Sequence, residues 1–178
     1  MKEKIEVLDY ASEILKAVKT GALLTTKSGD KVNTMTIAWG MLGIEWRKPI
    51  FITYVRENRF TKKQLEENAE FTVNIPYGEF DKNIISYCGS NSGKNVDKIS
   101  ELSLTLVDGE LVNVPAIKEL PLTLECKVIY SRLQDEALIN DEIKEACYPK
   151  DVDSSFCGAN KDYHIAYYGE IVNAYILK

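Results

Sequence analysis

The sequence predicts a mainly β fold with peripheral helices, arranged as an antiparallel barrel. Several segments of the 178-residue chain are rich in β-branched and aromatic residues and have few helical patterns between them, which favours an antiparallel barrel over a parallel α/β sheet. The first two of these segments are joined by Ser28-Gly29-Asp30, a turn that fits a hairpin. No GxGxxG follows an expected strand, so a Rossmann nucleotide site is not indicated.

The expected elements follow one another without a linker, a repeat or a low-complexity stretch, so we expect residues 1–178 to form a single domain. The first is a helix over about 6–18, where apolar residues from Val7 to Val18 fall on one face. Strands are expected at 22–27, 31–39, 49–55, 70–76, 103–107, near 111–114, at 122–132 and at 164–177. Helices are expected at 61–68, at 80–88 with Gly89 as the stop, at 96–101 and at 140–148, with a loop over 89–95.

The charge of the chain indicates a small anionic ligand. A net charge of −5 argues against general binding to nucleic acid. Segment 47–63 nevertheless carries a net charge of +5, which leaves −10 for the rest of the chain. A compact basic patch on an acidic protein is more typical of a site for a small anion than of a site for a polymer.

Composition also bears on location and on metals. The first residues contain acidic side chains and no apolar core of the signal-peptide type, and no apolar run approaches the roughly 20 residues that cross a bilayer. We therefore expect a soluble, cytoplasmic protein without a membrane partner. Cys88, Cys126, Cys147 and Cys157 are well separated and His164 is the single histidine, so we expect free thiols and no metal site.

The basic segment contains a possible phosphate site. Thr61, with Gln64 three residues later, has the pattern of a capping box that opens the helix at 61–68. A helix N-terminus presents N–H groups and positive potential, and Arg56 and Arg59 come just before it, which suits a phosphate. The same residues also fit a capped helix with a solvated basic surface.

Three other segments contain polar residues whose role cannot be decided from their chemistry alone. Asn33 interrupts the apolar face of the strand through 33–39, where it either begins an irregular strand or needs a partner such as a planar heteroaromatic ligand. The Gly/Ser loop 88–94, which ends at Lys94, could hold an anion on its backbone amides or could be a plain loop. His164, among tyrosines, could be a proton donor, a ring-stacking group or a structural residue.

Taken in order, these segments resemble the flavin reductase-like FMN-binding split-barrel family, the group that includes the flavoredoxins. The order and spacing of the matching segments are more specific than any single motif, and together they span most of the chain. The matching segments are NTMTIAWGMLGIEWRKPIFITYVRENRFTKKQLEENAEFTVNIP (33–76), CGSNSGKNVDK (88–98), ELPLTLEC (119–126) and DYHIAYYGEIVNAY (162–175).

The resemblance implies a six-stranded Greek-key split barrel that forms a homodimer, with FMN bound near the subunit interface. The residues that it places beside the cofactor are Asn33, Thr34, Met35, Thr36, Ala38 and Trp39 at the ring, Arg56, Asn58, Arg59 and Thr61 at the phosphate, and Ser92, Gly93 and Lys94 in a loop close to the flavin. No side chain has to act as an acid or base, and His164 is the one candidate for a catalytic role.

The implied reaction is hydride transfer from NAD(P)H to FMN, from which electrons pass to an acceptor. The flavin carries out the redox chemistry, while the protein positions the ring and tunes it. An alternative is an FMN-containing electron carrier that a partner protein reduces, without efficient NAD(P)H oxidation of its own. A third possibility is a split-barrel module that binds another cofactor, such as haem. No motif distinguishes NADH from NADPH.

Overall fold

The computed structural model describes residues 1–150 and 162–178. The strands are β1 (Lys2–Lys4), β2 (Ala22–Ser28), β3 (Lys31–Ile37), β4 (Gly40–Glu45), β5 (Lys48–Arg56), β6 (Glu70–Ile75), β7 (Leu106–Val107), β8 (Ala116–Ile117), β9 (Leu122–Leu133) and β10 (His164–Leu177). The helices are α1 (Ala11–Thr20), α2 (Phe60–Glu67), α3 (Lys82–Ser90), α4 (Lys98–Glu101) and α5 (Asp141–Cys147), with the 3-10 turns η1 (Val7–Tyr10) and η2 (Glu136–Leu138).

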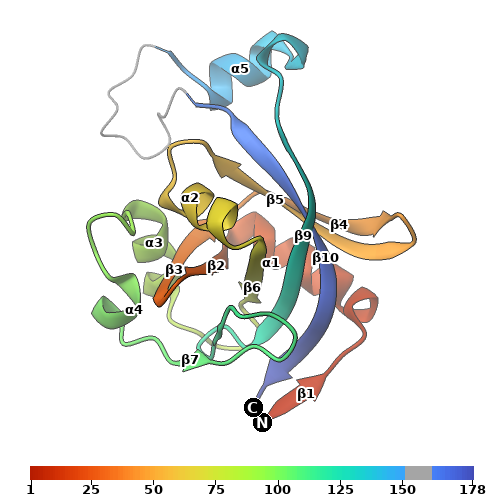
Figure 1. Cartoon of the computed structure of the whole chain (residues 1–178), viewed down its shortest axis with the longest axis vertical. Helices are drawn as coiled ribbons and strands as arrows, with labels where there is room; N and C mark the ends of the chain where they lie inside the picture. The colour runs from red at the N-terminus through yellow and green to blue at the C-terminus, as the bar shows by residue number, and fades with distance from the viewer. Residues whose placement is uncertain (151–161) are drawn as a thin grey trace.

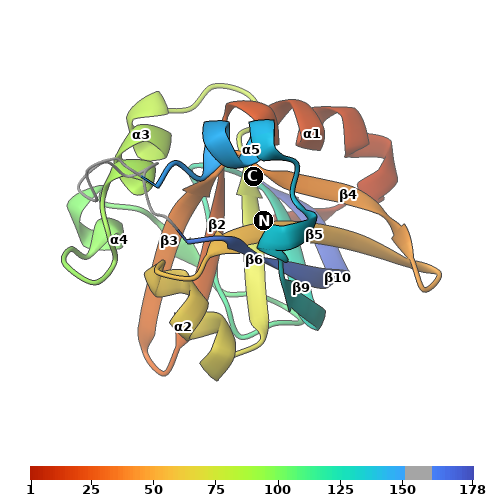
Figure 2. The same ribbon diagram turned by 90° about the horizontal axis from the view of Figure 1, so that it is seen from above.

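The strands form one large antiparallel sheet in the order β3-β2-β6-β9-β10-β5-β4, and β1 is added along β10. The two longest strands, β9 and β10, pair along most of their length. The hairpin β2–β3 lies at one end of this order and the hairpin β4–β5 at the other. The helices α1 and α2 approach the barrel from opposite sides and both pack on the core that the curved sheet encloses, and α3 lies beside β3 (Figures 1 and 2).

The mainly β, antiparallel fold class is therefore confirmed. The described residues place eight strands in the large sheet, so the implied number of six is not confirmed. The hairpin expected at residues 28–30 is present, and Gly29 turns the chain with a φ of +55°. This left-handed conformation is one that glycine adopts without steric cost.

The core fills both faces of β2. Leu24 packs inside the curved sheet with Phe71 of β6 and Leu124 of β9, and all three side chains are fully buried. Leu23 points to the opposite face, where it packs with Ile84 of α3. Burial of a side chain of this size contributes about 1.5–3 kcal/mol. The packing of Leu23 against Ile84 therefore holds α3, and with it the loop that follows α3, against the edge of the sheet at β3.

A glycine in β10 allows this packing. The pairing of β10 with β9 shifts register between Tyr168 and Gly169. A Cβ at Gly169 would lie 2.8 Å from Cε1 of Phe71 and closer still to its Cζ. Glycine at this position therefore leaves the space that the Phe71 ring fills at the centre of the barrel.

The N-terminal helix expected over about 6–18 is divided. The 3-10 turn η1 comes first, and α1 follows directly and ends before Gly21, which has a φ of +125°. Ile14 and Val18 are buried on one face of α1, whereas Leu15 is exposed. The helix thus covers the sheet with one face and presents Leu15 at the surface.

The prediction of a strand near 111–114 is wrong, because side-chain carboxylates accept the hydrogen bonds that a neighbouring strand would accept. The N–H of Leu111 donates to Glu125 at 2.7 Å, and the N–H of Asn113 donates to Glu70 at 2.7 Å. The short pair β7–β8 forms around this loop instead. It retains only the last two residues of the strand expected at 103–107.

Two further differences involve glycine. No strand is expected at β4, where Gly40 and Gly43 lower the β propensity, and this strand is held by its antiparallel pairing with β5. Helix α3 does not stop at Gly89 but continues to Ser90. A Cβ at Gly89 would lie 3.4 Å from the Cβ of Thr36, so this glycine allows a close approach between α3 and β3.

Candidate functional site

The end of β3 and the link to β4 form one wall of the site. The strand expected at 31–39 ends at Ile37, and Ala38 and Trp39 make the connection. The indole of Trp39 lies against the imidazole of His164, with ring centroids 4.6 Å apart and the planes tilted by 45°. This contact joins the link to the first residue of β10.

Asn33 connects three segments that are distant in sequence. Its side chain is buried, and its Nδ2 donates to Oγ1 of Thr61 in α2 at 3.1 Å. A Cβ at Gly93, in the loop after α3, would lie 2.8 Å from Cγ of Asn33. Asn33 therefore has a protein partner, and around it three of the segments singled out in the sequence meet.

The prediction of a capping box at the start of α2 is wrong. The helix begins at Phe60, Arg59 occupies the N-cap position, and no side chain caps the helix. Gln64 instead accepts a hydrogen bond from the Thr26 hydroxyl at 2.7 Å and donates to the Lys31 carbonyl at 2.8 Å. Because Gln64 is buried, its amide must find partners inside the fold, and these partners attach α2 to the hairpin β2–β3.

Two arginines lie at the start of α2. Arg59 is the N-cap residue, and Arg56 ends β5. The Arg56 guanidinium donates to the carbonyls of Asp162 at 3.0 Å and Cys147 at 2.9 Å, and it lies 5.0 Å from the ring centre of Tyr148. Arg56 therefore holds the end of α5 and the start of β10 together, in addition to bringing positive charge to the site.

His164 is buried among aromatic side chains. Its Nδ1 lies 2.7 Å from the hydroxyl of Tyr148, which also donates to Oε1 of Gln134 at 3.2 Å. Burial, followed by the charges of the two arginines, lowers the pKa of His164 to about 3. The imidazole is therefore neutral near pH 7, and Tyr148 and Trp39 fix the position of its ring.

A cavity of about 280 Å³ lies between these groups, just below the range of roughly 300–1,000 Å³ that is typical of small-molecule sites. A smaller hollow of about 30 Å³ adjoins it. The cavity is lined by Met35, Thr36, Ile37, Ala38, Trp39, Tyr54, Arg56, Arg59 and His164. The hollow shares Met35, Thr36 and Arg59 with the cavity and also reaches Asn33, Thr61, Ser92 and Gly93. Most of the residues singled out in the sequence are thus brought together.

Three of those residues do not line either space. Thr34 is fully buried on the opposite face of β3, where its hydroxyl accepts a hydrogen bond from Thr25 at 3.1 Å. Asn58 donates its backbone N–H to the carboxylate of Asp162 at 2.6 Å. The Nζ of Lys94 lies 3.5 Å from the Asn58 carbonyl, on the outer side of its loop.

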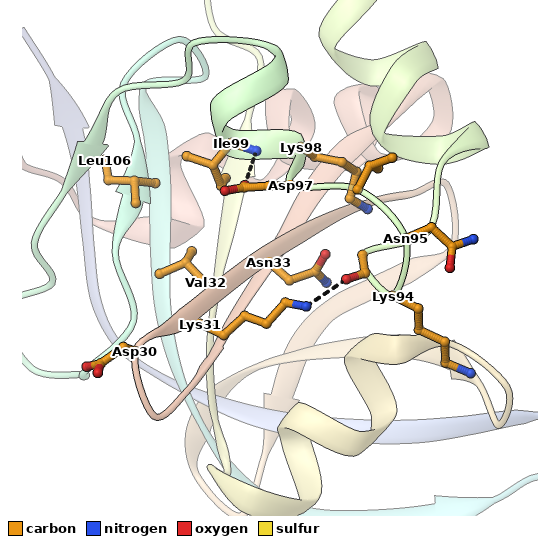
Figure 3. A pocket seen from close by; sticks show the side chains of 12 residues that line it. Asp30, Lys31, Val32, Asn33, Lys94, Asn95, Asp97, Lys98, Ile99 and Leu106 are labelled. Carbon is orange, nitrogen blue, oxygen red and sulfur yellow. Dashed lines mark hydrogen bonds between the residues drawn. The ribbon is translucent and has the colours of Figure 1, made fainter.

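Lys94 lines a third cavity of about 480 Å³, which Figure 3 shows and which shares Asn33, Gly93 and Lys98 with the small hollow. Lys31 crosses this space to donate to the Gly93 carbonyl at 3.0 Å (Figure 3). Asp97 caps α4, and the buried Lys98 donates to the carbonyl of Cys88 in the last turn of α3 and to that of Asn91 just after it. These charged groups hold the loop and α4 in place, so we assign the candidate site to the cavity beside His164.

Two tyrosines at the site, Tyr54 and Tyr148, were not singled out in the sequence. Tyr54 lines the cavity from β5, and the alternation of side chains along β5 could have indicated that Tyr54 lies on the face of the strand opposite to the core. Tyr148 hydrogen-bonds His164 from the residue after α5. No spacing or pattern links Tyr148 to His164, because their contact depends on where α5 lies relative to β10.

Three cysteines, Cys88, Cys126 and Cys147, are free thiols, as expected, and Cys157 lies outside the described residues. Burial raises the pKa of Cys88 to about 11. In residues 1–150 and 162–178, no group of three or more histidine, cysteine, aspartate or glutamate side chains is arranged to hold a metal ion. Within the same ranges, no helix combines the length and the apolar character that a membrane span requires.

Comparison with known proteins gives one family match. A sequence model described as "Flavin reductase like domain" matches residues 17–177. An uncharacterized protein of Archaeoglobus fulgidus is 34% identical over 100 residues, which cover 56% of this chain and 55% of that protein. The match thus spans little more than half the length of this relative.

Solved structures share the fold. Flavoredoxin from Methanosarcina acetivorans is 27% identical with a TM-score of 0.65, and the match covers 89% of this chain and 68% of that one. Flavoredoxin of Desulfovibrio vulgaris (Miyazaki F) is 23% identical with a TM-score of 0.65, over 89% of this chain and 69% of that one.

Proposed function

Because the chain belongs to the Flavin reductase like domain family, we propose that it is an FMN-dependent oxidoreductase that passes a hydride from NAD(P)H through FMN to an acceptor. One observation carries this proposal: residues of the segments 33–39, 56–61 and 92–93 line two adjoining hollows. We also propose that residues 1–178 form one domain, that the protein is cytoplasmic and that it works as a homodimer.

The residues around the cavity fit a phosphorylated planar cofactor. Trp39, Tyr54 and His164 contribute flat rings to its walls, and such surfaces suit an aromatic ring system. Arg59 lines both hollows, so it could contact a phosphate while the ring occupies the larger space. A guanidinium and the N-terminus of α2 are both favourable partners for a phosphate.

When bound, FMN would accept and donate the hydride. The chain's own residues would bind the cofactor, orient it and keep water away from it. The positive charges of Arg56 and Arg59 would stabilise negative charge that develops on the ring. The neutral His164, fixed by Tyr148 and Trp39, would offer a hydrogen-bonding nitrogen without adding charge.

An electron carrier that a partner protein reduces is the second candidate function, and the similarity to two flavoredoxins favours it. Steady-state oxidation of NADH and NADPH, with and without added FMN, separates the two candidates. An oxidoreductase turns over at least one of the two nucleotides rapidly, whereas the carrier does so only with its partner. A haem-binding role is disfavoured, because Tyr148 and Trp39 occupy the surroundings of His164.

Titration with FMN and riboflavin tests the cofactor assignment. Wild-type protein should bind one FMN per chain, and Arg59→Ala should weaken this binding. A charge-assisted hydrogen bond contributes about 1.5–3 kcal/mol, which corresponds to roughly 10- to 150-fold in affinity. Riboflavin has the same ring and no phosphate, so its affinity should change much less.

Lys63→Ala is the matched control, because Lys63 lies on the same helix, pairs with Glu67 and lines neither hollow. The titrations are repeated at two salt concentrations, since exposed charges are screened beyond about 10 Å at 0.1 M ionic strength. Equal losses for FMN and riboflavin would remove the phosphate role of Arg59. Failure of the folded wild type to bind FMN would overturn the proposed function.

A further inference from the structure

A second cavity of about 390 Å³ lies on the other side of the link between β3 and β4. Its walls come from α1, from the link and β4, from β5, and from the chain just after β9. It shares three residues with the cavity beside His164, namely Ala38, Trp39 and Tyr54. The two cavities are therefore neighbours across a thin wall made mostly of aromatic side chains.

Three apolar side chains that line the second cavity are exposed to solvent. Leu15 is 44% exposed, Trp39 43% and Met41 55%. Full burial of a side chain of this size contributes about 1.5–3 kcal/mol, so three of them grouped around one hollow form a binding surface. The Tyr54 hydroxyl donates to Sδ of Met41 at 3.5 Å, which joins two of the walls.

Few polar groups border these apolar walls. Lys19 contributes one ammonium group from α1, and Gln134 contributes its amide. Because Oε1 of Gln134 accepts from Tyr148, its NH2 group is the part of the amide that can donate to a ligand. Apolar walls with one or two donors suit a small planar ring that carries an oxygen acceptor.

Charge separates the two cavities. The cavity beside His164 contains two guanidinium groups, Arg56 and Arg59, which suit a phosphorylated ligand. The second cavity has a single lysine, which offers too little positive charge for the phosphates of a dinucleotide. Its walls therefore select an uncharged or singly charged ring.

We propose that the second cavity binds a one- or two-ring compound that bears a carbonyl group. The description of this site as the neighbour of a flavin site rests on the proposed function, whereas binding in the cavity does not depend on it. A ring seated there touches Trp39 and Tyr54, which also line the proposed flavin cavity. Trp39 and Tyr54 thus lie between the two ligand spaces.

The test is calorimetric titration of the FMN-saturated protein with 4-hydroxyacetophenone, a planar ring with a carbonyl. We expect saturable binding to wild type and binding at least about tenfold weaker to Leu15→Glu, because the variant removes apolar contact area and adds a charge. Met41→Glu should weaken binding in the same way from a different wall. Both positions are exposed, so both variants should fold.

Ile143→Glu is the matched control, since Ile143 is an exposed apolar residue of α5 that lines neither cavity. It should bind the probe as wild type does, and all variants should retain the FMN affinity of wild type. Absence of saturable binding, or unchanged affinity in both cavity variants, would overturn the proposal. So would tighter binding of nicotinamide mononucleotide in competition with the probe, because the cavity would then be a nicotinamide site. If FMN fails to bind while the probe still does, the proposed function is lost but the binding site is retained.

Discussion

His164 illustrates how its surroundings decide the chemistry of a single residue. The sequence singles it out as the one histidine of the chain, and its ring lies in the wall of the candidate site. Its charge state could not be predicted, because that state depends on burial and on arginines brought close by the fold. Lys98 shows the same effect, since burial lowers its pKa to about 8, and no local pattern marks it.

The low pKa of His164 predicts a loss of stability at mildly acidic pH. In the unfolded chain, histidine takes up a proton near pH 6.5, whereas in the folded chain His164 does so only near pH 3. Between these values the unfolded state binds more protons, so the free energy of unfolding falls as pH falls, by up to about 1.4 kcal/mol per pH unit. Urea unfolding at pH 7.5 and 5.5 measures this change.

His164→Gln serves as the reference for that experiment, because glutamine does not titrate. The loss of stability between the two pH values should be smaller in the variant than in wild type. Equal losses would show that His164 is protonated alike in both states, and the neutral imidazole would have to be abandoned.

At the scale of elements, local patterns predicted the long strands. They did not predict where side chains from distant elements take the place of a strand partner or of a helix cap. Alternation and β-branched residues identified β2, β5, β9 and β10. The segment 111–114 has a strand-like composition, yet Glu125 and Glu70, which are remote in sequence, take its N–H groups. The start of α2 was misread for the same reason, since Gln64 is used to hold a hairpin rather than to cap its own helix.

The space at Gly169 predicts a specific weakness in β10. Gly169→Ala places a methyl group against the Phe71 ring, and overpacking of this kind costs about 1–3 kcal/mol. Gly43→Ala is the matched control, because Gly43 also lies in a strand and has no atom within 4 Å of the added Cβ. The control should be neutral or slightly stabilising, by up to about 1 kcal/mol. Urea unfolding of both variants checks this difference, and equal stabilities would contradict the packing argument.

At the scale of the whole molecule, the sheet order brings the site together and could not be read from any one segment. β3 and the loop after α3 lie near α2 because α2 and α3 both pack on the hairpin β2–β3. The resemblance indicated which segments belong near the cofactor, and Asn33, Arg59 and Ser92 do lie around one space. The resemblance could not show that Thr34 faces away from this space. Thr34 is buried on the other side of the hairpin, and that burial depends on how α3 packs.

The outer surface of the sheet supports the proposed homodimer. Ile44 and Trp46 on the hairpin β4–β5 and Tyr130 on β9 are exposed, and Trp46 contacts Tyr130 with ring centroids 6.2 Å apart. Apolar groups of this kind are typical of surfaces that are covered in an assembly. Light scattering at micromolar concentration should give twice the 20.1 kDa mass of one chain, and Ile44→Lys should lower it. A wild-type mass near that of one chain would contradict the dimer.

The position of Trp39 between two cavities also has an optical consequence. The chain contains two tryptophans, one in the shared wall and the other, Trp46, at the tip of a hairpin. An indole in contact with a bound chromophore loses emission by energy transfer, whereas a distant one does so less efficiently. In a chain with Trp46→Phe, the remaining intrinsic fluorescence comes from a single emitter that borders both ligand spaces, so the protein carries its own reporter of their occupancy.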